Sequence, residues 1–407
     1  SFTVRQLNCI AGIVITASHN PKIYNGYKVY WKDGGQLPPE RADEVLACIN
    51  QLDYTDYKTM DKQTALDAGL LHIIGKEVDD IYMSRVRSLC VQPELCREMG
   101  KTMRIVYSPL NGSGNVPVRR ILKEVGFENV FVVPEQEMPD PNFTTVGAAP
   151  NPENYSAFDL ARELAVKENA DVIFATDPDC DRMGVAVPHG DDYVLITGNE
   201  MGIILLDYIC RTRKALGTMP EHPVAVTTIV STDMATPVAA KYGVELRRTL
   251  TGFKFIAEKI QQFEETGSHT FEFGFEESYG YLSGPHVRDK DAVNASMLCC
   301  EMTAWYRAQG MTLAQAMDAL YRKHGFFRND LGSFTYEGAD GMARMQTIMD
   351  TLRSDPPRAL AGRPVTAAVD YLTGRGVTGD LPRSNVLEYR AGDVKLLVRP
   401  SGTEPKI

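Results

Sequence analysis

The sequence predicts an α/β protein built from several domains. Its 407 residues exceed what one hydrophobic core normally organises. Strands and helices alternate over much of the chain, which is typical of α/β domains with largely parallel sheets. After Phe327 the pattern changes to short strands around one helix, and this indicates a small α+β domain with an antiparallel sheet.

The composition limits the class of partner. With 43% hydrophobic and 24% charged residues, the chain resembles an ordinary soluble globular protein. A formal net charge of -10 without a basic stripe argues against nucleic acid. The longest apolar stretch, 201–210, is interrupted by Asp207 and is shorter than the roughly 20 residues of a membrane span. Eight cysteines without a C-x-x-C pair predict reduced thiols in a cytoplasmic protein.

Shifts in composition divide the chain into segments. A strand, a glycine-rich loop, a helix and a second strand follow one another over 103–133, and a similar order recurs over 223–248. The first residue is Ser1 rather than Met, and the last residues continue a strand, so we expect a fragment. The shifts near Met99, His222 and Phe327 predict the following domains: 1–98, 99–221, 222–327 and 328–407.

The first polar loop follows a β-branched run. Residues 12–16 predict a strand buried on both faces, and Ser18 and His19 stand at its carboxyl end, where open α/β sheets bind ligands. Ser18 beside His19 suggests a nucleophile, although no G-x-S-x-G elbow is present. On this segment alone, a turn that merely ends the strand is an equally good interpretation.

The second polar loop carries three aspartates. Asp177, Asp179 and Asp181 alternate, so in an extended segment their carboxylates face one side and require a cation. Oxygen ligands favour Mg²⁺ or Ca²⁺. An EF-hand is excluded because Arg182 stands where that loop needs glycine. The alternative is a solvated acidic turn.

The third polar loop lies between two aromatic strands. Glu276 and Ser278 can exchange hydrogen bonds with vicinal sugar hydroxyls, although a plain acidic hairpin turn fits the spacing equally well. Further polar and cationic groups that we expect to bind substrate are Thr251, Gly252, Lys254, Arg288 and Lys290.

The fourth polar loop ends the chain. Arg399 can form two hydrogen bonds with a phosphate, while Ser401, Thr403 and the backbone around Gly402 form an anion-binding nest. No nucleotide P-loop pattern occurs there. A Pro-Ser-Gly turn between strands is the alternative.

Taken together, the four loops resemble those of the α-D-phosphohexomutase family, in the family's order and over nearly the whole chain. TDPDCDR and GFEESYGYL are most similar to the phosphoglucomutase branch, which also includes phosphopentomutases. The motifs are TASHNP with NGYK, DPDCDR, GFEESYG and RPSGTEPK.

The resemblance implies three related α/β domains with mixed sheets and a smaller C-terminal α+β domain around a central cleft. It implies interconversion of glucose 1-phosphate and glucose 6-phosphate through a phosphoserine at Ser18, with glucose 1,6-bisphosphate as intermediate and activator. Mg²⁺ would be held by Ser18, Asp177, Asp179 and Asp181.

The resemblance also assigns supporting roles. His19 and Lys28 are the candidates for proton transfer, and Lys28 would need its pKa lowered by nearby cations. Arg182 would neutralise phosphate, although an ion pair is its simpler role. The partner would be a small sugar phosphate, bound by a monomer or weak homodimer.

Other activities are weighed against this one. A phosphomannomutase or phosphopentomutase would share every motif. A metal-dependent phosphatase with Asp177 as nucleophile is disfavoured because Asp181 stands where Thr or Val belongs. A non-catalytic sugar-phosphate-binding protein would not need Ser18. The family's N-terminal arginine-bearing loop, which completes its site, has no counterpart in this sequence.

Overall fold

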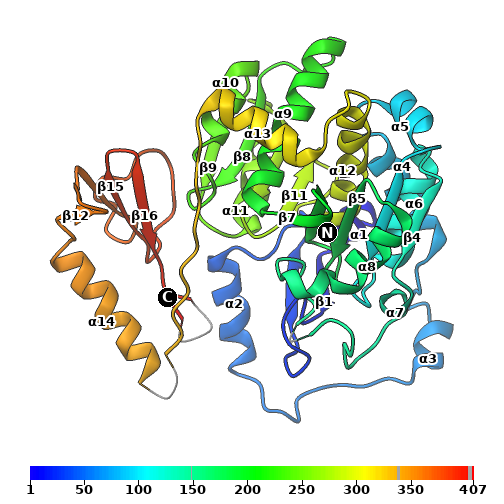
Figure 1. Ribbon diagram of the computed structural model, residues 1–407. Coiled ribbons are helices and arrows are strands. Elements are labelled where there is room, and N and C mark those ends of the chain that lie inside the picture. Colours follow the sequence, from blue (N-terminus) through cyan, green and yellow to red (C-terminus); the bar gives the residue numbers. More distant parts are fainter. Residues whose placement is uncertain (148, 337–339, 402–405) are drawn as a thin grey trace. The chain divides into compact units, whose positions relative to one another are not determined.

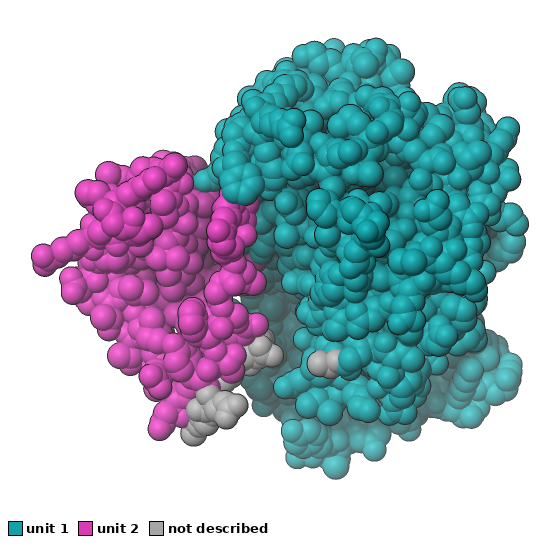
Figure 2. Space-filling model, in the orientation of Figure 1, with its two compact units in different colours: residues 1–248, 252–327 teal, residues 249–251, 328–407 magenta. Residues whose placement is uncertain are grey.

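A computed structural model describes residues 1–147, 149–336, 340–401 and 406–407 (Figure 1). The chain forms two compact units, coloured separately in Figure 2. The first unit contains residues 1–248 and 252–327, and the second contains 249–251 and 328–407. Each unit is described by itself.

A five-stranded mixed sheet in the first unit has the order β4-β3-β5-β6-β7. Strand β3 pairs in parallel with β4 and β5, whereas β5, β6 and β7 pair antiparallel. Every residue of β5 is buried, as expected for a β-branched strand inside a sheet. The strands are β3 (Arg104–Ser108), β4 (Asn129–Val132), β5 (Val172–Thr176), β6 (Met183–His189) and β7 (Asp192–Ile196), and the helical segments between them are α6 (Asn115–Val125), α7 (Pro134–Glu137), η1 (Tyr155–Phe158) and α8 (Asp159–Glu168).

A four-stranded sheet with the order β11-β10-β8-β9 follows in the same unit. Strand β10 pairs in parallel with β8 and antiparallel with β11, so this sheet is also mixed. The mixed sheets agree with the predicted fold class and correct the simpler expectation of largely parallel strands. The elements are β8 (Pro223–Thr228), β9 (Glu245–Thr249), β10 (Thr270–Glu276), β11 (Gly280–Ser283), α9 (Gly198–Leu216), α10 (Ala235–Tyr242), α11 (Phe253–Thr266), α12 (Ala292–Arg307) and α13 (Leu313–His324).

One apolar cluster joins the five-stranded and the four-stranded sheets of this unit. It includes buried residues of β3 and β5 from the five-stranded sheet, of β10 from the four-stranded sheet, and of α9 and α12. Capping fixes where the helices begin: Asp291 accepts two backbone N–H groups of α12, and Thr312 caps α13 within a capping box. The start of α12 is therefore fixed, and Lys290 directly precedes its cap.

The N-terminal part of the first unit contains the predicted strand but not its predicted burial. Strand β1 (Ala11–Ile15) pairs antiparallel with β2 (Tyr27–Trp31) in a two-stranded sheet. Ile13 is 56% exposed and Val14 38%, and because neighbouring side chains point to opposite faces, both faces are open. The β-branched run specified a strand, but not what covers it. The surrounding helices are α1 (Phe2–Gln6), α2 (Pro39–Ile49), α3 (Lys62–Asp67), α4 (Lys76–Arg87) and α5 (Pro93–Met99).

The second unit has the predicted antiparallel sheet, with the order β14-β15-β16. Met349 of the helix packs with Leu387 and Tyr389 of the sheet to form a small core. Within the described residues, no helix of either unit is long and apolar enough to cross a membrane. The elements of this unit are α14 (Gly341–Ser354), β12 (Ala359–Leu360), β13 (Arg363–Pro364), β14 (Ala367–Asp370), β15 (Leu387–Ala391) and β16 (Val394–Val398).

Candidate active site

The acidic loop is the turn that joins β5 to the antiparallel β6. Asp177, Asp179 and Asp181 each offer a carboxylate oxygen, and these oxygens lie within 4.8 Å of one another. Asp177 Oδ1 accepts the backbone N–H groups of Asp181 at 3.0 Å and Arg182 at 2.9 Å. Cys180 has a left-handed backbone with φ of 59°. The predicted cluster therefore forms, but a tight turn brings the carboxylates together rather than an extended segment.

A glycine-rich loop after β3 supports this turn. Ser113 donates from its backbone N–H at 2.8 Å and from its Oγ at 2.9 Å to the Pro178 carbonyl. A Cβ at Gly112 would lie 2.5 Å from Pro178 Cα, so only glycine allows the two backbones to approach. Sequence reasoning missed this role, although a glycine cluster directly after a buried strand is a signal for close approach.

Ser18 meets the acidic turn directly. Its Oγ donates to Asp177 Oδ2 at 2.7 Å and lies 3.1 Å from His19 Nδ1. Its backbone has φ of 50°, a left-handed conformation that serine rarely adopts, and its N–H donates to Thr16 Oγ1 at 2.8 Å. The first and second polar loops, 159 positions apart, therefore form one site.

Two lysines neutralise the turn from different segments. Lys28, opposite Val14 in the β1–β2 register, donates to Asp179 Oδ2 at 2.7 Å and Asp181 Oδ2 at 2.9 Å. Lys290 Nζ lies 3.1 Å from the same Asp181 oxygen. Burial works to lower the pKa of Lys28, but Asp181 and Asp179 outweigh it and raise that pKa. The expectation that neighbouring cations lower the pKa of Lys28 is therefore wrong: carboxylates are its direct partners.

The donor set fits a hard divalent cation. Asp179 Oδ1 and Asp181 Oδ1 are buried and have no hydrogen-bond partner among the described residues. Burial, followed by the charges of Asp181 and Asp179, raises the pKa of Asp177 well above its ordinary value. A cation bound by oxygen ligands would give these two carboxylate oxygens a partner. Its positive charge would also stabilise the ionised form of Asp177, which burial disfavours.

The histidine beside the serine is neutral near pH 7. Burial, and then the charge of Arg182, lowers the pKa of His19 to about 4. A neutral imidazole keeps one ring nitrogen free to accept a proton. Arg182 itself pairs with Glu153 at 2.5 Å, which is the ion pair that the sequence left as its simpler role.

The third polar loop lies beside the acidic turn. Arg182 forms an isolated antiparallel bridge with Gly280 at the start of β11. Glu276, at the end of β10, is buried, and its Oε1 accepts the Gly252 backbone N–H at 2.8 Å. Ser278 is half-buried in the turn between these strands. Lys254, in the first turn of α11, lies over the Phe255 ring at 5.1 Å, and Gly252 is the residue at which this helix is capped.

Arg288 and Lys290, both expected to bind substrate, lie in different surroundings. Arg288 is buried, donates to the Pro285 carbonyl at 2.7 Å, and pairs with Glu264 on α11. Its guanidinium is bound by partners inside the protein, so the expectation that it binds substrate is wrong. Lys290 instead faces the acidic turn, held also by Asp289 at 3.1 Å.

Asp289 is a positioning residue that the sequence did not reveal. Its Oδ2 accepts Tyr30 Oη at 2.7 Å and Gln36 Nε2 at 2.9 Å, while its Oδ1 accepts the Lys290 backbone N–H at 2.9 Å. This carboxylate therefore joins the N-terminal hairpin to the lysine of the site. In the sequence, Asp289 stands between Arg288 and Lys290, and nothing in that local pattern indicates its positioning role.

The phosphate loop belongs to the second unit. Arg399 is exposed directly after β16, and the Ser401 backbone N–H donates to the Lys406 carbonyl at 2.6 Å. Thr251, predicted to bind substrate, also belongs to this unit, and its Oγ1 is buried without a hydrogen-bond partner among the described residues. Gly402 and Thr403 lie outside the described residues.

Comparison with known proteins agrees with this geometry. Three models of phosphoglucomutase/phosphomannomutase α/β/α domains match the chain: domain I at 1–56, domain II at 80–190 and domain III at 197–324. A phosphoglucomutase of Staphylococcus aureus (strain MRSA252) is 37% identical over 420 aligned positions, which cover all of this chain and 73% of the relative. The chain therefore belongs to the phosphoglucomutase/phosphomannomutase family of α-D-phosphohexomutases.

Solved structures agree on the fold. The open form of parafusin, a phosphoglucomutase from Paramecium, has a TM-score of 0.70 at 20% identity and covers 99% of this chain and 73% of its own. A phosphomannomutase structure from Thermus thermophilus, described as putative, has a TM-score of 0.65 at 23% identity, with coverage of 97% and 76%. The predicted domain boundaries remain predictions.

The burial of Glu276 predicts a pH-dependent cost. Burial is the largest cause that raises the pKa of Glu276 from 4.5 to about 7. The folded carboxyl therefore holds its proton between these values where the unfolded one has lost it, and stability falls as pH rises through this window. We expect Glu276→Gln to gain about 2–3 kcal/mol relative to wild type between pH 5 and pH 8, from 1.36 kcal/mol per pKa unit.

Urea unfolding followed by tryptophan fluorescence measures this difference, because Trp31 and Trp305 both lie in the first unit. Glu258→Gln, on the exposed side of α11, controls for loss of a carboxylate from the same unit. An equal stability difference between Glu276→Gln and wild type at both pH values would contradict the predicted cost.

Proposed function

We propose that the protein interconverts glucose 1-phosphate and glucose 6-phosphate through a phosphoserine at Ser18. The observation that carries the proposal is the 2.7 Å hydrogen bond from Ser18 Oγ to Asp177, at a turn with two further carboxylates and two lysines. A strained serine at such a turn suits a phosphoryl carrier better than a structural turn. Family membership and the named Staphylococcus aureus relative support this activity.

The transfer needs a proton acceptor and a phosphate acceptor. The phosphoserine P–O bond breaks as a new P–O bond forms to the sugar hydroxyl; the hydroxyl proton passes to a base, and the released Ser18 Oγ takes up a proton to become a hydroxyl again. His19 is the proposed base, because it is neutral and its Nδ1 lies 3.1 Å from Ser18 Oγ. Lys28 holds its proton, so its proposed role is to neutralise charge and to position Asp179 and Asp181.

Two-way binding of a bisphosphate explains the other loops. Glucose 1,6-bisphosphate, the intermediate and activator, would turn round in the site and return its other phosphate to Ser18. Glu276 and Ser278 would bind sugar hydroxyls in either orientation. Substrate groups would also contact Thr251, Gly252, Lys254, Arg182 and Lys290, and the phosphate would be clamped by Arg399, Ser401, Gly402 and Thr403.

Mg²⁺ is the proposed metal. Asp177, Asp179 and Asp181, with an oxygen of modified Ser18, would hold it, and when bound it supplies positive charge that stabilises the transferring phosphoryl group. The two unpartnered carboxylate oxygens support this assignment.

The free cysteines agree with a cytoplasmic location, and a monomer or weak homodimer remains our proposed assembly state.

A phosphatase with Asp177 as nucleophile is less well supported. Both oxygens of Asp177 are engaged, Oδ1 by two backbone N–H groups and Oδ2 by Ser18. The hydroxyl of Ser18 meets the turn directly, so the serine rather than Asp177 is the better-placed carrier of a phosphoryl group. A non-catalytic binding protein would not need the Ser18 contact at all.

Ser18→Ala tests the carrier role. We expect the variant to lose the mass of the phosphoryl group in intact mass spectrometry and to lose at least about 10³-fold in kcat, because a nucleophile is removed. Ser88→Ala, at an exposed serine after α4, is the matched control and should keep both. A Ser18→Ala protein that keeps its phosphoryl group and its activity would refute the proposal.

Chelation tests the metal. After EDTA treatment we expect activity to vanish and to return with Mg²⁺, and calorimetry should detect Mg²⁺ binding that Asp181→Asn weakens at least about tenfold. Asp192→Asn, at an exposed partner of Arg162, should bind Mg²⁺ like wild type. Full activity after exhaustive chelation would exclude the metal assignment.

Comparing substrates tests the sugar. We expect the highest kcat/KM with glucose 1-phosphate, because the paired acids Glu276 and Glu277 can form hydrogen bonds with the sugar hydroxyls. Glu277 accepts from Thr228 and Ser231 at 3.1 Å, and we propose that Glu276 forms the direct hydrogen bonds with the sugar. A higher kcat/KM with mannose 1-phosphate or ribose 1-phosphate would replace glucose in the proposal.

A further inference from the structure

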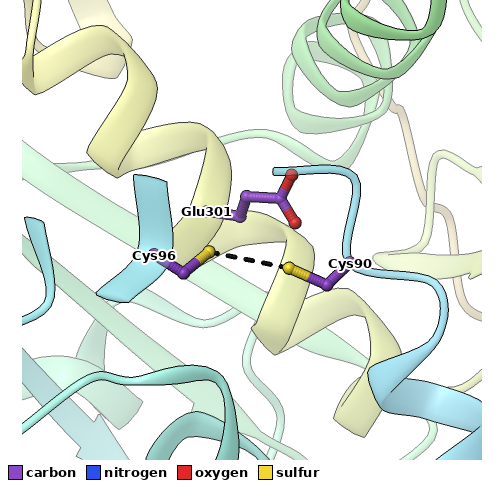
Figure 3. Close-up of side chains that lie close together, drawn as sticks. All are labelled: Cys90, Cys96 and Glu301. Carbon is purple, nitrogen blue, oxygen red and sulfur yellow. Dashed lines mark hydrogen bonds between the residues drawn. The ribbon is translucent and has the colours of Figure 1, made fainter. Parts of the chain in front are cut away.

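A second cluster of metal-ligating side chains is distinct from the acidic turn. It consists of Cys90, in the segment between α4 and α5, Cys96 on α5, and Glu301 on α12 (Figure 3). One ligand atom from each lies within 4.8 Å of the other two. Glu301 follows the helix cap Asp291 by ten positions, which is about 15 Å along the axis of α12 at 1.5 Å per residue.

The sulfur spacing matches that of two thiolates on one tetrahedral ion. Cys90 Sγ and Cys96 Sγ are 3.7 Å apart. Two bonds of about 2.3 Å at a tetrahedral angle place a pair of zinc-bound sulfurs about 3.8 Å apart, so the observed distance between the two sulfurs is compatible with one shared ion. A disulfide would require the two sulfurs to approach to about 2.05 Å.

The carboxylate of the cluster is fixed in place by neutral donors. Glu301 is fully buried, and its Oε1 accepts Gln92 N–H and Tyr208 Oη, each at 2.7 Å. The Val91 N–H donates to both oxygens at 3.0 Å, and the Cys90 thiol is a further hydrogen-bond partner of this carboxylate. The carboxylate is therefore oriented as metal-ligating groups are, with a lone pair of Oε2 available.

The ligand chemistry separates this cluster from the acidic turn. Thiolate sulfur selects thiophilic ions such as Zn²⁺, whereas three carboxylates suit hard ions such as Mg²⁺. Cys90 is only half-buried, so an ion can reach the cluster from solvent on that side. Cys96 and Glu301 lie deeper.

We propose that Cys90, Cys96 and Glu301 form a binding site for one thiophilic divalent cation of the zinc class. On binding, two S–H bonds break, both protons pass to solvent, and two S–metal bonds and one O–metal bond form. The fourth tetrahedral position is left to water. The ion ties the segment between α4 and α5 to α12 at a point remote from the reaction.

Cobalt provides the test, because sulfur ligands give charge-transfer bands that oxygen ligands do not. The starting material is reduced, metal-free protein with saturating Mg²⁺ added to occupy the acidic turn. One equivalent of Co²⁺ should then produce a thiolate-to-cobalt absorption band, and this band should disappear when Zn²⁺ displaces the Co²⁺. Cys90→Ser/Cys96→Ser should abolish the band. Glu301→Gln should weaken Co²⁺ affinity at least tenfold.

Cys9→Ser/Cys48→Ser removes the same number of thiols elsewhere and should keep the band. If the double variant fails to fold, Cys90→Ser alone, at the more accessible position, replaces it in the test and should also abolish the band. A band that persists without Cys90, the absence of any band in wild type, or a Cys90–Cys96 disulfide in protein purified with reductant would overturn the proposal. Mutase activity in Mg²⁺ should be the same with and without Zn²⁺ chelation, which separates this site from the proposed function.

Discussion

The arrangement of the first unit depends on one electrostatic constraint: three carboxylates are confined within a single tight turn. Such a cluster is unfavourable unless positive charge surrounds it. The chain meets this requirement with Lys28 from the N-terminal hairpin and Lys290 from the segment before α12. Because these lysines come from distant parts of the sequence, the acidic turn is also what brings those parts together.

The framework around the turn is fixed by backbone contacts together with a few side-chain hydrogen bonds. The turn joins two antiparallel strands, and Ser113 and Gly112 contact it at Pro178. Arg182 joins it to the start of β11. Asp289 then ties Tyr30 and Lys290 to each other. Preorganisation of this kind lets charged groups act without first rearranging.

The sequence predicted the elements better than their surroundings. The β-branched run of β1 was predicted to be buried and is exposed, whereas the similar run of β5 is buried throughout, because β-branching indicates strand geometry and does not specify which elements pack on the strand. Likewise, the three aspartates predicted a cluster, but Arg288 and Lys290 looked equivalent although one pairs with Glu264 and the other with Asp181. Such partners are set by tertiary structure, which composition and spacing do not encode.

The contact between Ser18 and Asp177 has a consequence for thermodynamic linkage. A phosphoryl group on that oxygen would place a charge of about −1.5 to −2 beside three carboxylates. The modified serine and a divalent cation must then favour each other, and by reciprocity the factor by which phosphorylation tightens cation binding is the factor by which the cation favours the phosphorylated form. Comparing the cation affinity of the two forms measures this coupling, and equal affinities would show that the serine and the turn act independently.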